Sequence, residues 1–423
     1  MNTYSSYKDS GVDWIGNIPS DWEVVRNKYL FDVTKNVVGE ESDKYQLLSL
    51  TKRGVVLRDI ESGKGKFPES FDTYQTVDKG DLIFCLYDID ETPRTIGISN
   101  YSGMITGSYK VVKCNTLTDP KFIYYNYLSI DDVKGLRPYY TGLRKVVRTE
   151  TFLNLNVRVP SLQEQQQISD YLDYKTLKID TLIKKTQQKI ELLKEQRISL
   201  INTTVTKGLN PNVEMKDSGI EWIGEIPSGW NVTKLKYTCN ITYGISPPDT
   251  TYNDKGRGEI LINGPVEYSK EDFGYTRSTK WTTDPKKFTE KGSLLFCLRG
   301  STGRMNITHD YVSIGRGVCS IISKESQWFM IYSMFIVRDY IQGEITGSTF
   351  PSVTKDDVDN YFICTPPQQE QQQIVDYLDK ETTKIDKLVD IESKRIILLK
   401  EYRQTLISEV VTGKVDVRNE VLV

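Results

Sequence analysis

Two stretches of the chain carry apolar residues at helical spacing over an unusual length. In the first, residues 161–207, the apolar positions are Ile168, Leu172, Ile179, Leu182, Ile183, Ile190, Leu193, Leu200 and Ile201. Most steps are three, four or seven residues, which aligns these side chains along one face of a helix. The stripe recurs 374 − 168 = 206 positions later, at Ile374, Leu378, Ile385, Leu388, Val389, Ile396, Leu399, Leu406 and Ile407. The pattern predicts two long amphipathic helices with equivalent buried faces.

Each predicted helix is too long for most globular domains. Pro160 and Ser161 mark the start of the first helix, and Gly208 with Pro211 marks its end. About 45 residues at about 1.5 Å each give a rod of roughly 65–70 Å. Because polar residues cover its other faces, the rod needs a partner along its stripe. We expect the helices to pair antiparallel as a coiled coil; the alternative is that each packs on its own globular part.

The segments outside the helices have a different pattern. Short apolar runs bounded by turn residues, such as YQLLSL, DLIFCLY and YKVVK, indicate strands, and FIYYNYLSI indicates a helix. Residues 211–366 repeat the pattern of residues 1–160 with a different middle. We therefore expect mixed α and β structure on both sides of the first long helix.

The chain contains one sequence twice. Residues 7–24 read YKDSGVDWIGNIPSDWEV and residues 215–232 read MKDSGIEWIGEIPSGWNV, an offset of 215 − 7 = 208. Residues 163–173 (QEQQQISDYLD) return at 369–379 (QEQQQIVDYLD), an offset of 369 − 163 = 206, too long for a solenoid repeat. The prediction is an α+β fold with a pseudo-two-fold internal repeat. Its parts are two mixed α/β domains (1–160 and 209–366), two long helices (161–208 and 367–413) and a tail (414–423).

The two copies agree unevenly. GDLIFCL in the first copy matches GSLLFCL in the second, but the loops that follow, YDIDETPRTIG and RGSTGRMNI, differ. Scaffold positions agree while loop positions have diverged. This favours two modules of one architecture that read different targets.

Composition narrows the class of protein. The formal net charge is −2, so any nucleic-acid binding must come from local basic patches. The start of the chain lacks a signal-peptide pattern, and no apolar run reaches the roughly 18 residues of a membrane span. We expect a cytoplasmic protein with no membrane span and with reduced cysteines, of which Cys85 and Cys297 occupy matching core strands.

The sequence contains few of the residues and motifs that a catalytic site would need. His309 is the one histidine of the chain, and a phosphate-binding loop of the form GxxxxGK[ST] is missing. Ser246-Pro247-Pro248-Asp249 lacks the aromatic residue that would stack on a flipped base, so a turn is the better interpretation. We expect no catalytic residues, no metal site and no cofactor in this chain.

These motifs together resemble a specificity subunit of a type I restriction–modification system. The resemblance rests on KDSGxxWIGxIPxxW at 8–22 and 216–230, on the GDLIFCL and GSLLFCLRGSTGR strands, on the TG pairs at 141–142 and 346–347, and on the QEQQQI helices. It covers nearly the whole chain, twice and in order. It implies two target recognition domains, a bipartite asymmetric DNA site and a non-catalytic role.

The resemblance also implies partners. Two modification subunits would carry S-adenosylmethionine and methylate adenine. Two optional restriction subunits would translocate and cleave DNA with ATP and Mg²⁺. We expect the modification subunits to dock on the long helices, with Gln163–Gln167 and Gln369–Gln373 as candidate contacts; simple solvation of the helix starts is the alternative. The competing function is a coiled-coil scaffold with two ligand-binding modules and no DNA role, and a self-sufficient methyltransferase is a third.

Candidate DNA-binding residues are basic, aromatic or hydroxyl side chains next to glycines. In the first half they are Lys52, Arg53, Arg94, Tyr109, Lys110, Arg137, Tyr139, Tyr140, Arg144, Lys145 and Arg148. In the second half they are Arg257, Arg299, Ser301, Thr302, Arg304, Arg316 and Thr349. Ordinary loop or strand-edge structure is the alternative for each. The pattern does not convert any of them into a base identity.

A stiff pair of rods predicts a fixed spacing between the two halves of the DNA site, since roughly 65–70 Å covers about two turns of a duplex. Inserting four residues after Lys184, with a matching insertion in the second helix, should lengthen the unspecified spacer and leave both half-sequences unchanged. Sequencing of methylated sites measures the spacer. An unchanged spacer would refute the idea that the length of the paired helices sets the spacing between the two half-sites.

Overall fold

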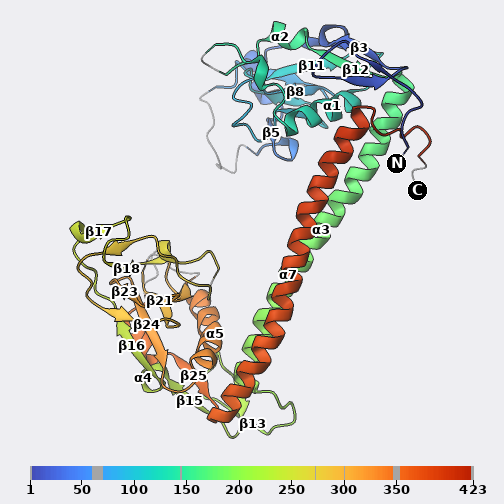
Figure 1. Ribbon diagram of the computed structural model, residues 1–423. Coiled ribbons are helices and arrows are strands. Elements are labelled where there is room, and N and C mark those ends of the chain that lie inside the picture. Colours follow the sequence, from blue (N-terminus) through green and yellow to red (C-terminus); the bar gives the residue numbers. More distant parts are fainter. Residues whose placement is uncertain are drawn as a thin grey trace. The chain divides into compact units, whose positions relative to one another are not determined.

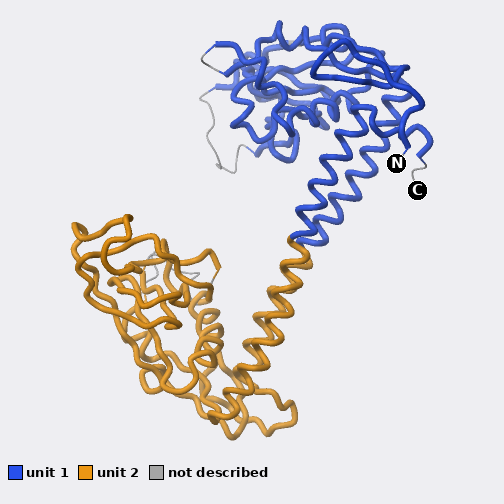
Figure 2. Tube along the Cα trace, viewed as in Figure 1, with its two compact units in different colours: residues 1–187, 394–423 blue, residues 188–393 orange. Residues whose placement is uncertain are grey.

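The computed structural model describes residues 2–59, 70–142, 145–271, 273–299, 301–345 and 353–420. The chain divides into two compact units (Figure 2). Unit 1 comprises residues 1–187 and 394–423, and unit 2 comprises residues 188–393. Both units mix helices and short strands (Figure 1), which confirms the predicted fold class.

Unit 1 is built around a four-stranded sheet with the order β4-β11-β8-β9. The strands are β1 (Tyr7–Asp9), β2 (Asn17–Pro19), β3 (Glu23–Arg26), β4 (Phe31–Thr34), β5 (Leu48–Thr51), β6 (Gly54–Leu57), β7 (Gln75–Val77), β8 (Leu82–Phe84), β9 (Ile96–Ile98), β10 (Gly103–Ile105), β11 (Lys110–Cys114) and β12 (Asn156–Val159). The helices are η1 (Asn27–Tyr29), η2 (Gly39–Lys44), α1 (Pro120–Asp132), η3 (Arg137–Tyr139), α2 (Thr149–Leu153) and the first part of α3 (Leu162–Lys207).

Unit 2 repeats this sheet as β16-β24-β21-β22 and adds a five-stranded sheet with the order β17-β19-β18-β23-β20. The strands are β13 (Met215–Asp217), β14 (Glu225–Pro227), β15 (Asn231–Lys234), β16 (Cys239–Tyr243), β17 (Tyr252–Asn253), β18 (Glu259–Ile262), β19 (Trp281–Thr282), β20 (Phe288–Thr289), β21 (Leu294–Cys297), β22 (Met305–Ile307), β23 (Val312–Ile314), β24 (Val318–Ser323) and β25 (Phe362–Thr365). The helices are α4 (Leu235–Thr238), η4 (Asp249–Thr251), η5 (Pro265–Glu267), α5 (Gln327–Ile345) and α6 (Lys355–Asn360), with the last part of α3 and the first part of α7 (Gln368–Val411). The last part of α7 belongs to unit 1.

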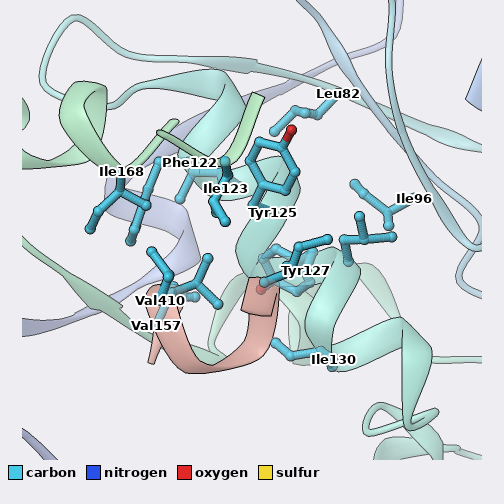
Figure 3. Packing of buried hydrophobic residues seen from close by; sticks show 14 of the residues in the cluster. Leu82, Ile96, Phe122, Ile123, Tyr125, Tyr127, Ile130, Val157, Ile168 and Val410 are labelled. Carbon is cyan, nitrogen blue, oxygen red and sulfur yellow. The ribbon is translucent and has the colours of Figure 1, made fainter. Parts of the chain in front are cut away.

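The core of unit 1 lies between its sheet and the long helices (Figure 3). Helix α1 contributes Phe122, Ile123, Tyr125, Tyr127 and Ile130 to one buried cluster. The same cluster includes Leu82 and Ile96 of the four-stranded sheet, Val157 of β12, and Ile168 and Val410 of the two long helices. Helix α1 therefore joins the sheet to the helical pair, and burial of these side chains stabilises both at once.

The two long helices pair antiparallel in each unit, as predicted. In unit 1, Ile168 and Leu172 near the start of α3 share a cluster with Leu406 and Ile407 near the end of α7. In unit 2, the same meeting occurs between the end of α3 and the start of α7, where Ile201 and Val205 share a cluster with Ile374 and Leu378.

Matching ion pairs connect the helices. Arg403 Nε lies 3.0 Å from Asp180 Oδ1 in unit 1, and Arg197 Nε lies 2.9 Å from Asp386 Oδ1 in unit 2. These two pairs are equivalent in the repeat, because 180 + 206 = 386 and 197 + 206 = 403.

Most of the predicted stripe is buried, with two exceptions. Buried members are Ile168, Leu172, Ile179, Ile190, Ile201, Ile374, Leu378, Ile385, Ile396, Leu406 and Ile407, and half-buried members are Ile183, Leu193, Leu200, Val389 and Leu399. The prediction was wrong for Leu182 and Leu388, which are 42% and 43% exposed. Each precedes a stripe residue by one position and so lies on the flank of its helix. The buried row continues instead through polar residues: Thr176, Thr186, Thr382 and Glu392.

A buried tryptophan joins each globular part to the start of its long helix. The Trp22 indole N–H donates to Glu164 Oε1 (3.1 Å), which also accepts from the Tyr4 hydroxyl (2.7 Å). In unit 2, the Trp230 indole donates to Glu370 Oε2 (2.9 Å). Both indoles are almost completely buried. A charged acceptor for a buried donor makes this a strong and specific anchor.

A second pair of hydrogen bonds repeats across the units. The Tyr125 hydroxyl donates to Asp173 (2.7 Å), and the Tyr332 hydroxyl donates to Asp379 (2.5 Å). These tyrosines come from α1 and α5, the equivalent helices that cover the sheets. Each globular part is thus held on its long helix at two points.

The segment predicted as a tail packs against the core of unit 1 through residues 415–417. Val415 and Val417 are buried in the main cluster, and the Asp416 N–H donates to the carbonyl of Asn2 (2.8 Å). Arg418 forms an ion pair with Asp416 (2.7 Å) and lies over the ring of Tyr4. Within the described residues, none of the helices combines the length and the hydropathy that a membrane crossing requires.

Candidate nucleic-acid interface

Each four-stranded sheet has two ends with different surroundings. We call the end where β4 begins and β11 ends the helix end, because the Asp119 N–H, just after β11, donates to Gln165 of α3 (2.8 Å). We call the opposite end, where β8 ends at Phe84 and β11 begins at Lys110, the loop end. In unit 2, the loop end is where β21 ends at Cys297 and β24 begins at Val318.

Several sequence candidates of unit 1 lie at the loop end. Tyr109 and Lys110 stand at the start of β11, and the Tyr109 ring stacks on Tyr87 with 6.1 Å between centroids. Arg94 precedes β9 and is neutralised, with its Nη1 3.5 Å from Asp132 and 3.9 Å from Asp131. Lys52 and Arg53 form the exposed two-residue turn of the β5–β6 hairpin.

The segment 137–148 is tied to the loop that follows β8. The Tyr140 hydroxyl donates to Asp90 Oδ1 (2.7 Å), and Lys145 Nζ donates to Asp90 Oδ2 (3.1 Å) and Glu91 (3.0 Å). The hydrogen bond from Tyr140, assisted by Lys145, lowers the pKa of Asp90 to about 2. We call this cluster the Asp90 latch.

The remaining candidates of this segment differ in exposure. Arg137 and Arg148 are exposed, and Tyr139 is half-buried against the main core. Arg144 lies outside the described residues.

Unit 2 presents its candidates in the same place. Arg299 follows β21 and is exposed, and Ser301 and Thr302 lie in the turn before β22. Arg304 is engaged internally, since its Nη2 donates to the Ser269 carbonyl (2.7 Å) and its guanidinium lies over the Tyr268 ring.

The other candidates of unit 2 lie in turns or beyond the described residues. Arg316, exposed, precedes β24, and Arg257 lies in an exposed turn before β18. Thr349, the TG pair at 346–347 and Gly300 lie outside the described residues.

Two positions in each QEQQQ segment form hydrogen bonds that hold the start of the long helix. Gln165 and Gln371 are buried, and their amides donate to the carbonyls of Pro160 (3.0 Å) and Pro366 (2.9 Å). With Glu164 and Glu370 bonded to tryptophans, the exposed remainder consists of Gln163, Gln166, Gln369, Gln372 and Gln373.

Sequence reasoning missed a repeated exposed pair at the helix end. Tyr29 and Tyr237 are each 64% exposed. Lys28 Nζ lies 5.1 Å from the Tyr29 ring centroid, and Lys236 Nζ lies 5.4 Å from that of Tyr237. The signal was present as the Lys-Tyr dipeptide at an offset of 237 − 29 = 208.

Titratable groups of the kinds most often used in metal sites and catalysis are present in the described part of the chain. No cluster of three or more His, Cys, Asp or Glu residues there could hold a metal ion. Burial raises the pKa of the Cys85 and Cys297 thiols, so they behave as core residues. His309 bonds to Thr276 and Ser278.

Comparisons with known proteins give a consistent result. The family model described as "Type I restriction modification DNA specificity domain" matches residues 19–192 and 227–401. The chain is 26% identical over 433 residues to the putative type I restriction enzyme MjaX specificity subunit of Methanocaldococcus jannaschii, covering 96% of both.

Solved structures share the fold. A chain from a structure of a type I R-M system superposes with a TM-score of 0.74 at 19% identity, over 94% of this chain and 99% of that one. The HsdS subunit from Thermoanaerobacter tengcongensis gives a TM-score of 0.56 at 19% identity, over 94% and 98%.

The Asp90 latch predicts an unusual titration. Its stabilising effect should be fully present above the ordinary aspartate pKa of about 3.9 and should be lost as the pH falls through about 2. Tyr140→Phe should raise the pKa of Asp90 more than Lys145→Met, because the tyrosine hydrogen bond is the larger cause. NMR titration of labelled aspartate carboxyl carbons measures both. Equal pKa values in the wild type and in Tyr140→Phe would contradict the latch.

Proposed function

Because the chain belongs to the type I restriction–modification DNA specificity family, we propose that it is the DNA sequence-recognition subunit of such a system and reads a bipartite, asymmetric site. Each unit would read one half of the site. The chain directs adenine methylation by modification subunits and cleavage by restriction subunits, and is itself not an enzyme. S-adenosylmethionine, ATP and Mg²⁺ would be bound by those partners. The complex would act in the cytoplasm.

The observation that carries the proposal is the contrast between the two ends of the sheets. The loop ends differ between the units and carry basic and aromatic candidates, such as Tyr109 with Lys110 in unit 1 and Arg299 with Arg316 in unit 2. The helix ends keep the same anchors and the same exposed Lys-Tyr pair. A protein that reads two different DNA words with one architecture needs this combination.

The internal repeat supports a stoichiometry of two modification subunits for each chain. Packing inside the chain does not explain why some exposed residues are identical in both copies. A partner that binds both copies in the same way would explain it. Leu182 and Leu388 are 42% and 43% exposed, and Leu192 and Leu398 are 63% and 64% exposed. We propose that two modification subunits bind, one to each copy of this surface.

Grooves beside the Lys-Tyr pairs are a second repeated feature that could contact the same partner. In unit 1, a groove of about 410 Å³ is lined by Tyr29, Leu117 and Gln165, among others. In unit 2, a groove of about 120 Å³ is lined by Tyr237 and Gln371, the equivalents of Tyr29 and Gln165, and by Lys324. A tyrosine that is apolar on its face and polar at its tip suits a protein interface. The grooves lie at the helix end, away from the basic loops.

The function is tested by mapping methylated adenines in cells that express the chain with its modification partner. The expected map is one asymmetric motif of two short words with an unspecified spacer. Exchange of residues 23–159 for the corresponding recognition segment of a relative should change one word only. A map without any motif, or one in which both words change together, would contradict the proposal that each unit reads one half of the site.

The partner surface is tested by native mass spectrometry of the assembled complex. Tyr29→Ala and Tyr237→Ala should each leave one modification subunit bound, and the double variant should leave none. Both side chains are mostly exposed, so the thermal stability of the chain should not change. Tyr311→Ala, which removes an exposed tyrosine elsewhere on unit 2, is the control. Two bound subunits in the double variant would exclude these tyrosines as the contact.

A further inference from the structure

The loop end of unit 2 holds one arginine in an unusually rigid place. The Val318 N–H donates to the Gly315 carbonyl (3.1 Å), which closes a four-residue turn with Arg316 at its second position. The Arg316 side chain is exposed, and among the described residues no hydrogen bond or ion pair engages its guanidinium. Arg304, at the same end, is instead held by backbone carbonyls.

The turn is fixed by the strands around it. The Gly315 N–H donates to the Ile262 carbonyl (2.9 Å), and the Leu298 N–H donates to the Gly317 carbonyl (2.9 Å). The Ser246 hydroxyl accepts from the Arg316 N–H (3.1 Å) and donates to Asn263 Oδ1 (2.8 Å). The backbone that carries the guanidinium is therefore held from three neighbouring segments.

Both neighbours of Arg316 must be glycine. A Cβ atom on Gly315 would lie 1.9 Å from Asn263 Oδ1, and one on Gly317 would lie 2.6 Å from the Asn263 carbonyl oxygen. The N–H groups of Asn263 and Gly264 donate to Glu267, which is 1% exposed and paired with Lys280. A buried, hydrogen-bonded network thus supports a single projecting side chain, the arrangement of a preorganised contact.

Unit 1 has the same turn without the arginine. Lys110 pairs with Phe84 as Cys319 pairs with Phe296, so residues 106–109 correspond to residues 315–318. The Tyr109 N–H donates to the Thr106 carbonyl (3.2 Å), closing the equivalent turn. Its second position is Gly107, where a Cβ atom would lie 2.5 Å from the Thr73 carbonyl oxygen. Unit 1 therefore presents no side chain at this position, and the exposed residue there is Ser108.

We propose that Arg316 reads a guanine in the half-site recognised by unit 2, through its O6 and N7 atoms in the major groove. The planar fork of arginine matches these two acceptors, and a rigid backbone directs it at one base pair. A phosphate contact would not need this rigidity, because a flexible lysine serves as well. The absence of an equivalent side chain in unit 1 makes the position one source of the difference between the half-sites.

The inference rests on the proposed function and is tested in the full chain expressed with its modification partner. In the methylation map, Arg316→Ala should relax one guanine position of one word by roughly 5- to 150-fold in discrimination. The other word should stay unchanged. Arg316→Lys, which keeps the charge without the fork, should retain most total methylation and lose part of the discrimination.

Two matched controls accompany the test. Arg277→Ala removes another exposed arginine of unit 2, one that donates to the Val266 carbonyl, and should leave the motif unchanged. Ser108→Ala changes the equivalent turn of unit 1 and should leave the word of unit 2 unchanged. Thermal unfolding of Arg316→Ala should match the wild type, since the side chain is exposed.

Two results would overturn the inference. One is an unchanged motif in Arg316→Ala. The other is a uniform decrease in methylation at all sites with the motif intact, which identifies a phosphate contact. Both leave the proposed function standing, whereas a wild-type map without a bipartite motif would remove it.

Discussion

The structure depends on the narrow apolar stripe of two very long helices. A helix such as α3, 46 residues long with one apolar face, gains too little from local hydrogen bonds alone and must bury that face. Pairing with α7 buries most of the stripe. The polar members of the buried row, and the equivalent pairs Arg403–Asp180 and Arg197–Asp386, restrict how the helices can align. A register shift would separate these charges from their partners.

The globular parts depend on the helices in the same way in both units. The indole of Trp22 or Trp230 is buried at a helix start, and its donor requires an acceptor there. Glu164 and Glu370 supply it. Tyr125 and Tyr332 add a second point of attachment through carboxylates nine residues further along the helix, since 173 − 164 = 9 and 379 − 370 = 9. These contacts use side chains at matching positions of the two copies, so both copies keep the same attachment.

The sequence predicted the helices, their pairing and the internal repeat, because apolar periodicity and repeated segments can be read directly from the order of residues. It was wrong for Leu182 and Leu388, because spacing alone does not separate the centre of a stripe from its flank. The roles of Glu164 and Gln165 were not predictable from a run of glutamines. The partner of Glu164, Trp22, lies 142 positions away in the chain, and no local pattern connects them.

The candidate site was predicted only in outline. The basic loops were recognised from composition, but composition does not show which cations are already neutralised. Arg94 and Lys145 are paired with carboxylates up to 55 positions distant, and Arg304 is bonded to backbone carbonyls. These internal partners lower the availability of a side chain for DNA without leaving a trace in the sequence around it.

The two ends of each sheet obey different constraints, and this explains how one scaffold can serve two specificities. Side chains at the helix end are fixed by anchors that both copies share, so substitution of an anchor would cost stability in either unit. An exposed side chain at the loop end, such as Arg316, can change without loss of packing once the backbone beneath it is secured. The turn at 315–318 is a local example of how the shared backbone and the variable side chain are kept separate. Its backbone is matched in unit 1, while its projecting side chain is not, so recognition can diverge without disturbing the fold.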